Sequence, residues 1–242
     1  MRFGGLLALE DFHLEVPEGG LYGLIGPNGA GKTTVFNLVS GFLKPSAGAV
    51  FFHRREITGL PPHEITRRGL ARTFQNSRLF GDLTVLDNVL AGAHCRGRAS
   101  WGEAVLRLPR YRREERQRRH LAHCLLEEVG LADAARDQAG QLPYGHQRRL
   151  EIARALATRP QFLLLDEPAA GLNPQETQEM LQFLKYIQKN HRLTMLVIEH
   201  NLRLVMNLCH HLTVLDHGLT IAQGPPETVR RHPEVVRAYL GS

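Results

Sequence analysis

Two hydrophobic patterns alternate along the chain. Continuous apolar runs occur at 21–25 (LYGLI), within 162–167 (FLLLDE) and within 193–200 (LTMLVIEH). Such runs are typical of strands that are buried on both faces of a parallel sheet. Between them, residues 33–43 and 175–190 place apolar residues three and four positions apart, which predicts amphipathic helices. Strands that alternate with helices predict a mainly parallel α/β core.

Three further segments complete this pattern. Residues 49–57 predict a short strand and a turn, and HLTVLDHG followed by LTIAQG predicts a hairpin that turns at 216–218. From 83 to 158 the spacing of apolar residues is mostly helical, so this part is expected to form a helical insert. The glycine-rich stretch GPNGAGKTT, at 26–34, lies between the first predicted strand and the first predicted helix.

The composition is that of an ordinary soluble globular protein. The chain has 242 residues, of which 43 % are hydrophobic and 22 % charged, enough for one core or for a core with a smaller subdomain. No apolar run is long enough to span a bilayer, and we expect no secretory signal. Cys95, Cys124 and Cys209 are far apart and odd in number, so they are expected to be free thiols in a reducing compartment.

The net charge is +6, and much of the excess lies in RLPRYRREERQRR, at 107–119, with seven arginines and two glutamates. One interpretation is a solvated helix face with pairs such as Glu114–Arg118 and Glu115–Arg119. The other is a patch that faces a membrane or a partner. Aromatic residues hardly interleave with the arginines, so we expect no nucleic-acid partner.

The segment 26–34 fits the pattern G-x-x-x-x-G-K-[ST] of phosphate-binding loops. Glycine accepts positive φ and lets a phosphate approach the backbone, and the following helix adds the positive end of its dipole. The lysine supplies a charge to the β and γ phosphates, the first threonine is a ligand for Mg²⁺, and the second contacts the α or β phosphate. The predicted phosphate loop comprises Gly26, Pro27, Asn28, Gly29, Ala30, Gly31, Lys32, Thr33 and Thr34.

The run FLLLDEP places two carboxylates at the end of a buried strand. In phosphate-loop ATPases, such a strand lies beside the loop. Asp166 is then expected to hold Mg²⁺, directly or through water. Glu167 is expected to accept a hydrogen bond from the attacking water and to act as general base. Without a cation or a proton, the adjacent carboxylates would repel each other.

Four further segments carry a family resemblance. QLPYGHQRRLEIARALA precedes the acidic strand, RTFQN contains Gln75, AAGLNP follows the acidic strand, and VIEHN contains His200. In this order they resemble the ATP-binding cassette (ABC) ATPases over nearly the whole chain. RTFQNSRLFGDLTVLDNVLAG, the Tyr-Gly pair and PEVVRAYLG resemble one branch, the larger of the two ATPase types of branched-chain amino-acid importers. The lipopolysaccharide-export ATPases are close relatives.

The resemblance implies a phosphate-loop NTPase fold of the α/β class, with a mainly parallel sheet, an antiparallel β part and an inserted helical subdomain. Residues 1–75 and 159–242 would form the ATP-binding core, and 76–158 the helical subdomain. The implied activity is ATP hydrolysis, with Mg²⁺, that powers transport of a small solute at the cytoplasmic face of the membrane. The implied partners are a second ATPase subunit, identical or paralogous, transmembrane permease subunits and, indirectly, a solute-binding protein.

The resemblance also implies roles for single residues. Phe3 would stack on adenine, and Gln75 would contact Mg²⁺ and water while its loop touches the membrane partner. His200 would bond the γ-phosphate, and Asn173 would cross the interface of a dimer. The signature segment, residues 142–146, would face the ATP of the other monomer from the start of a helix near residue 144. It comprises Leu142, Pro143, Tyr144, Gly145 and His146.

The sequence departs from the family pattern at three places. Pro143 replaces a serine and so lacks a hydroxyl for the γ-phosphate, which predicts slow but real hydrolysis. Proline is expected to fit the first turn of the helix. Asn173 replaces an acidic residue, and the few residues before Phe3 are expected to weaken adenine binding. Two other functions stay open: an ATP-binding regulatory module with very low turnover, and an export or soluble ABC ATPase.

Overall fold

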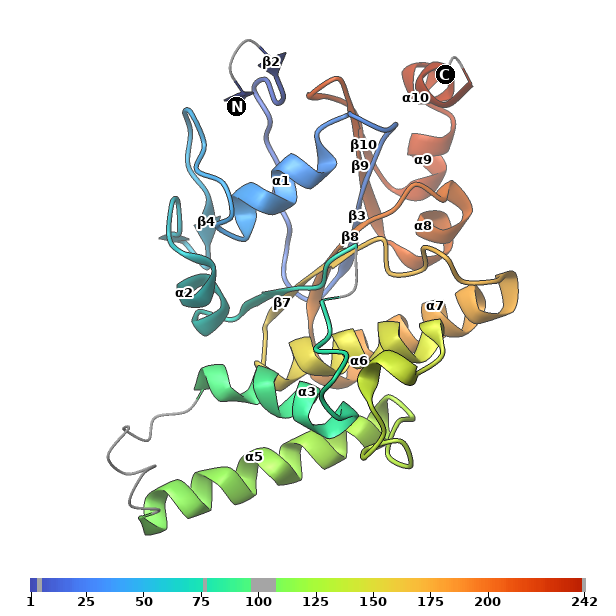
Figure 1. Ribbon diagram of the computed structural model, residues 1–242. Coiled ribbons are helices and arrows are strands. Elements are labelled where there is room, and N and C mark those ends of the chain that lie inside the picture. Colours follow the sequence, from blue (N-terminus) through green and yellow to red (C-terminus); the bar gives the residue numbers. More distant parts are fainter. Residues whose placement is uncertain (4–5, 76–77, 97–107, 241–242) are drawn as a thin grey trace.

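A six-stranded sheet forms the centre of the computed structural model, which describes residues 1–242 except 4–5, 76–77, 97–107 and 241–242 (Figure 1). The strand order is β10-β9-β3-β8-β7-β6, and every neighbouring pair is parallel except β9 and β10. The strands are β3 (Leu21–Ile25), β6 (Leu70–Arg72), β7 (Phe162–Asp166), β8 (Thr194–Ile198), β9 (His211–Asp216) and β10 (Leu219–Gly224). The expected mainly parallel sheet and the hairpin at 216–218 are therefore confirmed.

The apolar runs predicted as strands are buried on both faces of the sheet. In β7, Leu163 and Leu165 pack into one hydrophobic cluster, whereas Leu164 packs into the other. The same alternation separates Met195 from Leu196 in β8. Because successive side chains point to opposite faces, a central strand covered by helices on both sides must be apolar throughout.

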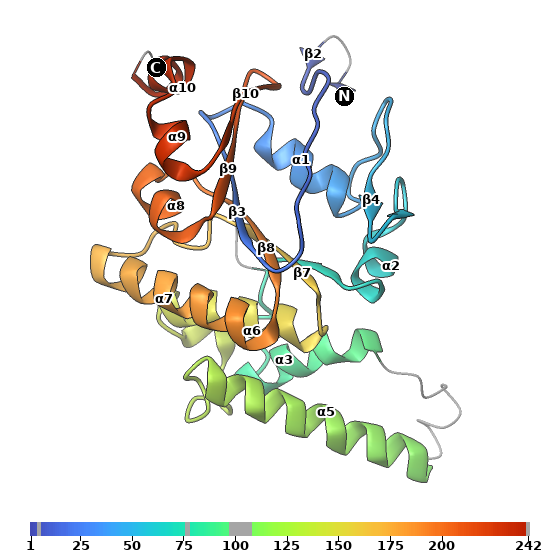
Figure 2. The same cartoon turned by 180° about the vertical axis from the view of Figure 1, so that it is seen from behind.

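Helices flank this sheet on both faces (Figures 1 and 2). Two short hairpins, β1 (Arg2–Phe3) with β2 (Leu6–Leu7) and β4 (Phe51–Phe52) with β5 (Arg55–Glu56), pair outside it. The helices are α1 (Lys32–Val39), α2 (Pro62–Arg67), α3 (Val85–Ala93), η1 (His94–Arg96), α5 (Pro109–Glu128), η2 (Ala139–Gln141), α6 (Tyr144–Ala157), α7 (Pro174–His191), α8 (Leu202–Leu208), α9 (Pro226–Arg230) and α10 (Pro233–Leu240).

Helices α3, α5 and α6 lie together on one side of the molecule, below the sheet in both views (Figures 1 and 2). We call them the helical group. They come from the stretch 83–158, which was expected to be mostly helical. Gly130, with φ 73°, ends the turn after α5, so the stretch is several helices rather than one. A Cβ at Gly92 would lie 2.2 Å from the Arg154 carbonyl oxygen, so glycine lets α3 and α6 pack closely.

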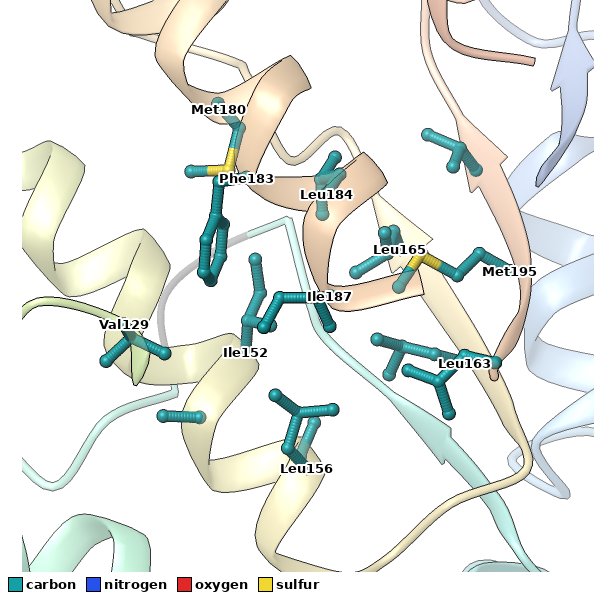
Figure 3. Close-up of a cluster of buried hydrophobic side chains, with 14 of the residues drawn as sticks. Val129, Ile152, Leu156, Leu163, Leu165, Met180, Phe183, Leu184, Ile187 and Met195 are labelled. Carbon is teal, nitrogen blue, oxygen red and sulfur yellow. The ribbon is translucent and has the colours of Figure 1, made fainter. Parts of the chain in front are cut away.

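Helix α6 joins this group to the sheet. Figure 3 shows Ile152 and Leu156 of α6 among apolar side chains of α7, β7 and β8. The labelled neighbours include Phe183 and Ile187 of α7 and Met195 of β8. One hydrophobic cluster therefore runs from the helical group to one face of the sheet, and α6 packs against both.

Two expectations about these elements need correction. The helix expected over 33–43 ends at Val39, because Gly41 has φ 77°. The strand expected near 49–53 is only Phe51–Phe52. Strand β8 pairs with both β3 and β7, so it lies between the strand before the phosphate loop and the acidic strand. The Glu114–Arg118 and Glu115–Arg119 pairs form at 3.1 and 3.2 Å.

Two expectations from the composition concern the cysteines and membrane-spanning helices. The three cysteines form no disulfide with one another. Within the described ranges, no helix combines the length and the apolar character needed to cross a bilayer. Of the basic run 107–119, Arg107 lies outside the described residues.

Candidate nucleotide-binding site

The carboxyl ends of four parallel strands meet at one edge of the sheet. In the register, Leu24 of β3 and Asp166 of β7 are both aligned with Ile198 of β8. The residues that follow β3, β6, β7 and β8 therefore leave the sheet at the same edge. In open α/β sheets, ligands bind at this carboxyl edge.

The phosphate loop leaves β3 at this edge and turns directly into α1. Gly31 has φ 104°, and a Cβ there would lie 2.8 Å from the Ala8 carbonyl oxygen. A Cβ at Gly26 would lie 2.0 Å from the Leu215 carbonyl oxygen. Both positions therefore require glycine. Helix α1 begins at Lys32, so its N-terminal amides point toward the loop, as an anion site requires.

Lys32 is folded back into the loop. Its side chain is buried, and Nζ donates to the carbonyl oxygens of Gly26 and Pro27 at 2.7 and 2.8 Å. Burial lowers the pKa of Lys32, and the nearby carboxylates of Glu167 and Asp166 oppose that shift. The loop carbonyls thus hold the ammonium group beside the phosphate position. Thr33 is exposed and Thr34 is half-buried at the start of α1.

Asp166, at the end of β7, is paired with an arginine that the sequence reasoning did not single out. Arg72 Nη2 donates to Asp166 Oδ2 at 2.9 Å, and both side chains are nearly inaccessible to solvent. Arg72 Nη1 also donates to Asn37 Oδ1 and Ser40 Oγ of α1 and its cap, at 2.7 and 3.0 Å. Burial raises the pKa of Asp166, and the hydrogen bond and charge of Arg72 oppose this rise.

Glu167 follows Asp166 in a strained conformation. Its φ of 48° is uncommon for a residue with a side chain, and such strain is often stored at functional sites. Gln75 Nε2 donates to Glu167 Oε2 at 2.9 Å, and His200 Nδ1 lies 3.6 Å from Glu167 Oε1. Three residues expected to share the site, from three different strand ends, are thus brought together.

The signature segment lies at the start of α6, which begins at Tyr144, as expected. Pro143 occupies the N-cap rather than the first turn, so the expected position within the turn is wrong by one residue. Its carbonyl oxygen accepts from the amides of His146 and Gln147, but no side chain caps the helix. Pro143, Tyr144 and His146 are exposed, and Leu142 is buried. An exposed helix N-terminus can receive an anion from a second molecule.

Asn173 lies at the start of α7, and Phe3 lies in strand β1. Asn173 caps α7: its Oδ1 accepts from the Glu176 amide, while Glu176 Oε2 accepts from the Asn173 amide, both at 2.9 Å. This capping box explains locally why an amide suits the position. The backbone of Phe3 pairs with Leu6 in the β1–β2 hairpin, and its side chain lies outside the described part.

Sequence reasoning also missed Glu199, next to His200. It is almost fully buried, and its Oε1 accepts from the Ala169 amide at 3.1 Å. Burial raises the pKa of Glu199. The glutamate therefore ties the end of β8 to the loop after β7. The available signal was a carboxylate at the end of a fully apolar strand, the same signal that indicated Asp166.

The profile of a family described as "ABC transporter" matches residues 9–170. This chain belongs to the ABC transporter family. A second profile, "Branched-chain amino acid ATP-binding cassette transporter", matches residues 220–242 and confirms the expected branch. As an ABC ATP-binding chain, the protein is an ATPase whose hydrolysis of ATP drives transport.

Curated relatives of the ABC family are similar over the full chain. The high-affinity branched-chain amino acid transport ATP-binding protein BraF of Pseudomonas aeruginosa is 47 % identical over 100 % of this chain and 94 % of its own length. LivG of Escherichia coli K12, named in the same way, is 45 % identical over the same shares. The lipopolysaccharide export system ATP-binding protein LptB of Acidithiobacillus ferridurans is 36 % identical over 97 % of this chain and 91 % of its own length.

Solved ABC cassettes share the fold. The ADP conformation of MJ1267, an ATP-binding cassette of an ABC transporter, matches with a TM-score of 0.87 and 34 % identity over 100 % of this chain and 96 % of that one. A dimeric post-hydrolysis state of the cassette MJ0796, bound to ADP and Pi, matches with a TM-score of 0.76 and 26 % identity, over 93 % and 94 %. The expected ABC ATPase fold is therefore confirmed.

Proposed function

We propose that this ATPase powers the uptake of branched-chain or other hydrophobic amino acids, through closure of an ATP-bound dimer. One observation carries the proposal: a single edge of the sheet brings the phosphate loop and Lys32 near Asp166 and Glu167, with Gln75 and His200 against Glu167. ATP hydrolysis needs these elements together: a phosphate cradle, a cation, a metal ligand and a base for water.

The residues at this edge fit ATP and Mg²⁺. Gly26 and Gly31 let the loop turn tightly against the Leu215 and Ala8 carbonyl oxygens, and a glycine-rich backbone lets a phosphate approach its amides. The Thr33 hydroxyl, the Asp166 carboxylate and the Gln75 amide oxygen are the oxygen donors that Mg²⁺ prefers, so these three residues would hold it. The ion supplies neutralisation of charge on the phosphates when it is bound. Lys32 exchanges its loop carbonyls for the β and γ phosphates.

Glu167 is the general base in this proposal. Its carboxylate accepts a hydrogen bond from the attacking water, and Gln75, 2.9 Å away, orients that water. His200 bonds the γ-phosphate from the other side of Glu167. The strained backbone of Glu167 keeps its carboxylate pointed toward both partners.

The signature segment serves the second subunit, identical or paralogous. The exposed N-terminus of α6 offers Tyr144 and Gly145 to the γ-phosphate that is bound in the partner's phosphate loop. ATP then stabilises the closed dimer, because it has contacts to both subunits only in that state. Asn173, at the start of α7, and the loop before it contact the partner, and Phe3 stacks on adenine.

Residues 76–158 act as a helical subdomain and 1–75 with 159–242 as the ATP-binding core. Between them is a hollow of about 310 Å³, lined on one side by Arg72 and Thr73 and on the other by Phe80 and Arg154. Phe80 is 53 % exposed, and its ring centre lies 5.8 Å from the guanidinium carbon of Arg154. The transmembrane permease subunits dock here, next to Phe74, Gln75 and Arg78, which we call the Gln75 segment. Through this contact they receive the movement of the dimer.

The cargo and the location follow from the branch. BraF and LivG are named for high-affinity transport of branched-chain amino acids, and the C-terminal profile carries the same description. We therefore assign the chain to the cytoplasmic face of the membrane, as a peripheral subunit. A solute-binding protein delivers the amino acid to the permease and contacts the ATPase only indirectly.

Phosphate release by the transporter assembled in detergent tests the proposed activity. Glu167→Gln should reduce the steady-state rate by roughly 10²-fold or more, because a general base is lost. It should also trap an ATP-dependent dimer, visible by light scattering. Glu15→Gln, at an exposed glutamate, is the matched control and should leave the rate unchanged. Equal rates for Glu167→Gln and the control would refute the assigned base.

Co-purification tests the docking hollow. Phe80→Ser should reduce recovery of the ATPase with tagged permease, while Phe51→Ser, at an even more exposed phenylalanine of the β4–β5 hairpin, should not. If both substitutions lower recovery alike, the contact does not lie at the hollow.

A further inference from the structure

The signature helix holds the backbone on both sides of residues 76–77 with charged side chains. Arg148 donates to the carbonyl oxygens of Phe74 and Gln75, at 3.2 and 2.6 Å. One turn further along α6, Glu151 Oε1 accepts from the Arg78 amide at 3.1 Å. Arg148 and Glu151 also pair with each other at 3.0 Å, and both side chains are almost fully buried. This pair therefore holds the backbone carbonyls of Phe74 and Gln75 and the backbone amide of Arg78.

A buried ion pair of this kind favours one specific arrangement of the chain more than it raises the free energy of unfolding. Desolvation of two charges offsets much of their attraction, so such a pair depends on hydrogen bonds to its other donors and acceptors. Of these groups, Arg148 Nε is buried without a hydrogen-bond partner. Here the satisfying partners are backbone groups at Phe74, Gln75 and Arg78. A displacement of Arg148 would therefore remove the donor to both carbonyl groups and would move the Gln75 segment.

Tyr144 connects this pair to the signature segment. Arg148 Nη2 donates to the Tyr144 hydroxyl, and the guanidinium carbon lies 4.9 Å from the centre of the tyrosine ring. The ring also packs on the loop after β7, since a Cβ at Gly171 would lie 2.9 Å from Tyr144 Cε1. Tyr144 is 43 % exposed, so a molecule that binds at the N-terminus of α6 can reach it.

The contacts form one continuous chain. The Tyr144 hydroxyl bonds Arg148, Arg148 bonds the Gln75 carbonyl, and the Gln75 side chain donates to Glu167 at 2.9 Å. At one end is the segment that meets the partner's nucleotide, and at the other is the base for the chain's own nucleotide. This arrangement joins the two nucleotide sites of a dimer through a single subunit.

We propose that Tyr144 and Arg148 are positioning residues that set Gln75 against Glu167 according to whether the partner's nucleotide occupies the signature segment. The inference rests on the proposed function, because the signature segment must face a second nucleotide. When Tyr144 is held by that nucleotide, Arg148 is fixed, and Gln75 keeps its bond to Glu167. When it is released, the Gln75 segment shifts and the base is no longer aligned.

Tyr144→Phe tests the proposal, because it keeps the ring and removes only the hydroxyl. In the assembled transporter, kcat should fall about tenfold, as for loss of one hydrogen bond to a charged group, with KM unchanged. Tyr186→Phe, at an exposed tyrosine of α7, is the matched control and should leave kcat unchanged. In the isolated chain, amide exchange at Arg78 should become faster in Tyr144→Phe and not in the control.

A double-mutant cycle separates positioning from direct contact with the nucleotide. In a Gln75→Ala background, Tyr144→Phe should have no further effect on kcat, since its route to Glu167 is already lost. Arg148→Lys keeps the positive charge but loses the several N–H donors of the guanidinium group, so it should lower kcat as Tyr144→Phe does. It replaces Tyr144→Phe in the test if that variant fails to fold. A full tenfold loss in the Gln75→Ala background, or unchanged Arg78 exchange in both variants, would overturn the proposal.

Failure of this inference is distinguishable from failure of the proposed function. If wild-type transporter releases no phosphate and Glu167→Gln traps no dimer, the proposed function is wrong. The positioning role of Tyr144 and Arg148 is then wrong as well. If the wild type hydrolyses ATP and Glu167→Gln is inactive, but Tyr144→Phe has the same kcat as the Tyr186→Phe control, only the positioning role of Tyr144 and Arg148 is wrong.

Discussion

Arg72→Met removes one partner from the buried ion pair between Arg72 and Asp166. Asp166 then keeps a carboxylate that is only 4 % exposed and has lost its arginine. Breaking a buried pair by removing one partner costs about 3–5 kcal/mol. Asn37 and Ser40 also lose a donor each, which places the expected cost toward the upper end. Methionine fills a similar volume, so a cavity adds little.

Urea unfolding at several pH values measures this cost. Burial raises the pKa of Asp166, and loss of the opposing Arg72 should raise it further in the variant. A carboxyl group with a raised folded-state pKa contributes stability that is fully present below its unfolded-state pKa and is lost as pH rises through its folded-state pKa. The destabilisation should therefore be larger at pH 8 than at pH 5. Arg67→Met, at an exposed arginine of α2, is the control and should change stability by less than about 0.5 kcal/mol.

The double variant Arg72→Met with Asp166→Asn provides the decisive comparison. Because it removes both charges, it should be more stable than Arg72→Met alone by at least about 1 kcal/mol. If Arg72→Met costs no more than the Arg67 control, or if the double variant is less stable than Arg72→Met, the assignment of a strong buried pair is wrong.

Three further predictions concern single positions. Pro143→Ser supplies a hydroxyl at the N-cap of α6 and should raise both helix stability, by about 1 kcal/mol, and the ATPase rate of the assembled transporter; an unchanged rate would contradict the account of slow hydrolysis. Glu199→Gln removes a buried carboxyl with a raised pKa, so its melting temperature relative to wild type should increase from pH 5 to pH 8, and a constant difference would argue against burial as the cause. Gly92→Ala should destabilise the chain by about 1–3 kcal/mol or more in denaturant titration, because Cβ meets the Arg154 carbonyl; a change near zero would mean that α3 and α6 are loosely packed.

The sequence pattern predicted most elements around the site because they depend on local signals. The apolar runs that became β3, β7 and β8 are distinct from amphipathic segments, and the phosphate loop contains its own glycine and lysine signals. The start of α6 near Tyr144, by contrast, was implied by the family resemblance. Local pattern did not predict the strand order, because each parallel strand is equally apolar and the pairing partner leaves no mark on it.

The contacts that position the site could not be predicted in the same way. Arg72 and Asp166 are separated by 94 residues, and Arg148 and Gln75 by 73. A single arginine at a strand end, or within a helix rich in arginine, gives no sign of which carboxylate or carbonyl it will meet. Such pairs depend on how the helical group is set against the sheet, which is a tertiary property. Glu199 is buried by the loop after β7, a tertiary contact that the sequence around His200 does not indicate.

ATP-dependent cross-linking between subunits tests most directly whether two copies share each nucleotide. In a background with Glu167→Gln and the exposed Cys124 changed to serine, Asn28→Cys places a thiol on the phosphate loop and His146→Cys one on the signature segment, both at exposed positions. A mixture of the two single variants should give a cross-linked dimer with ATP and Mg²⁺, and little without nucleotide. Absence of that product with ATP, or equal yields with and without it, would contradict the shared-nucleotide dimer.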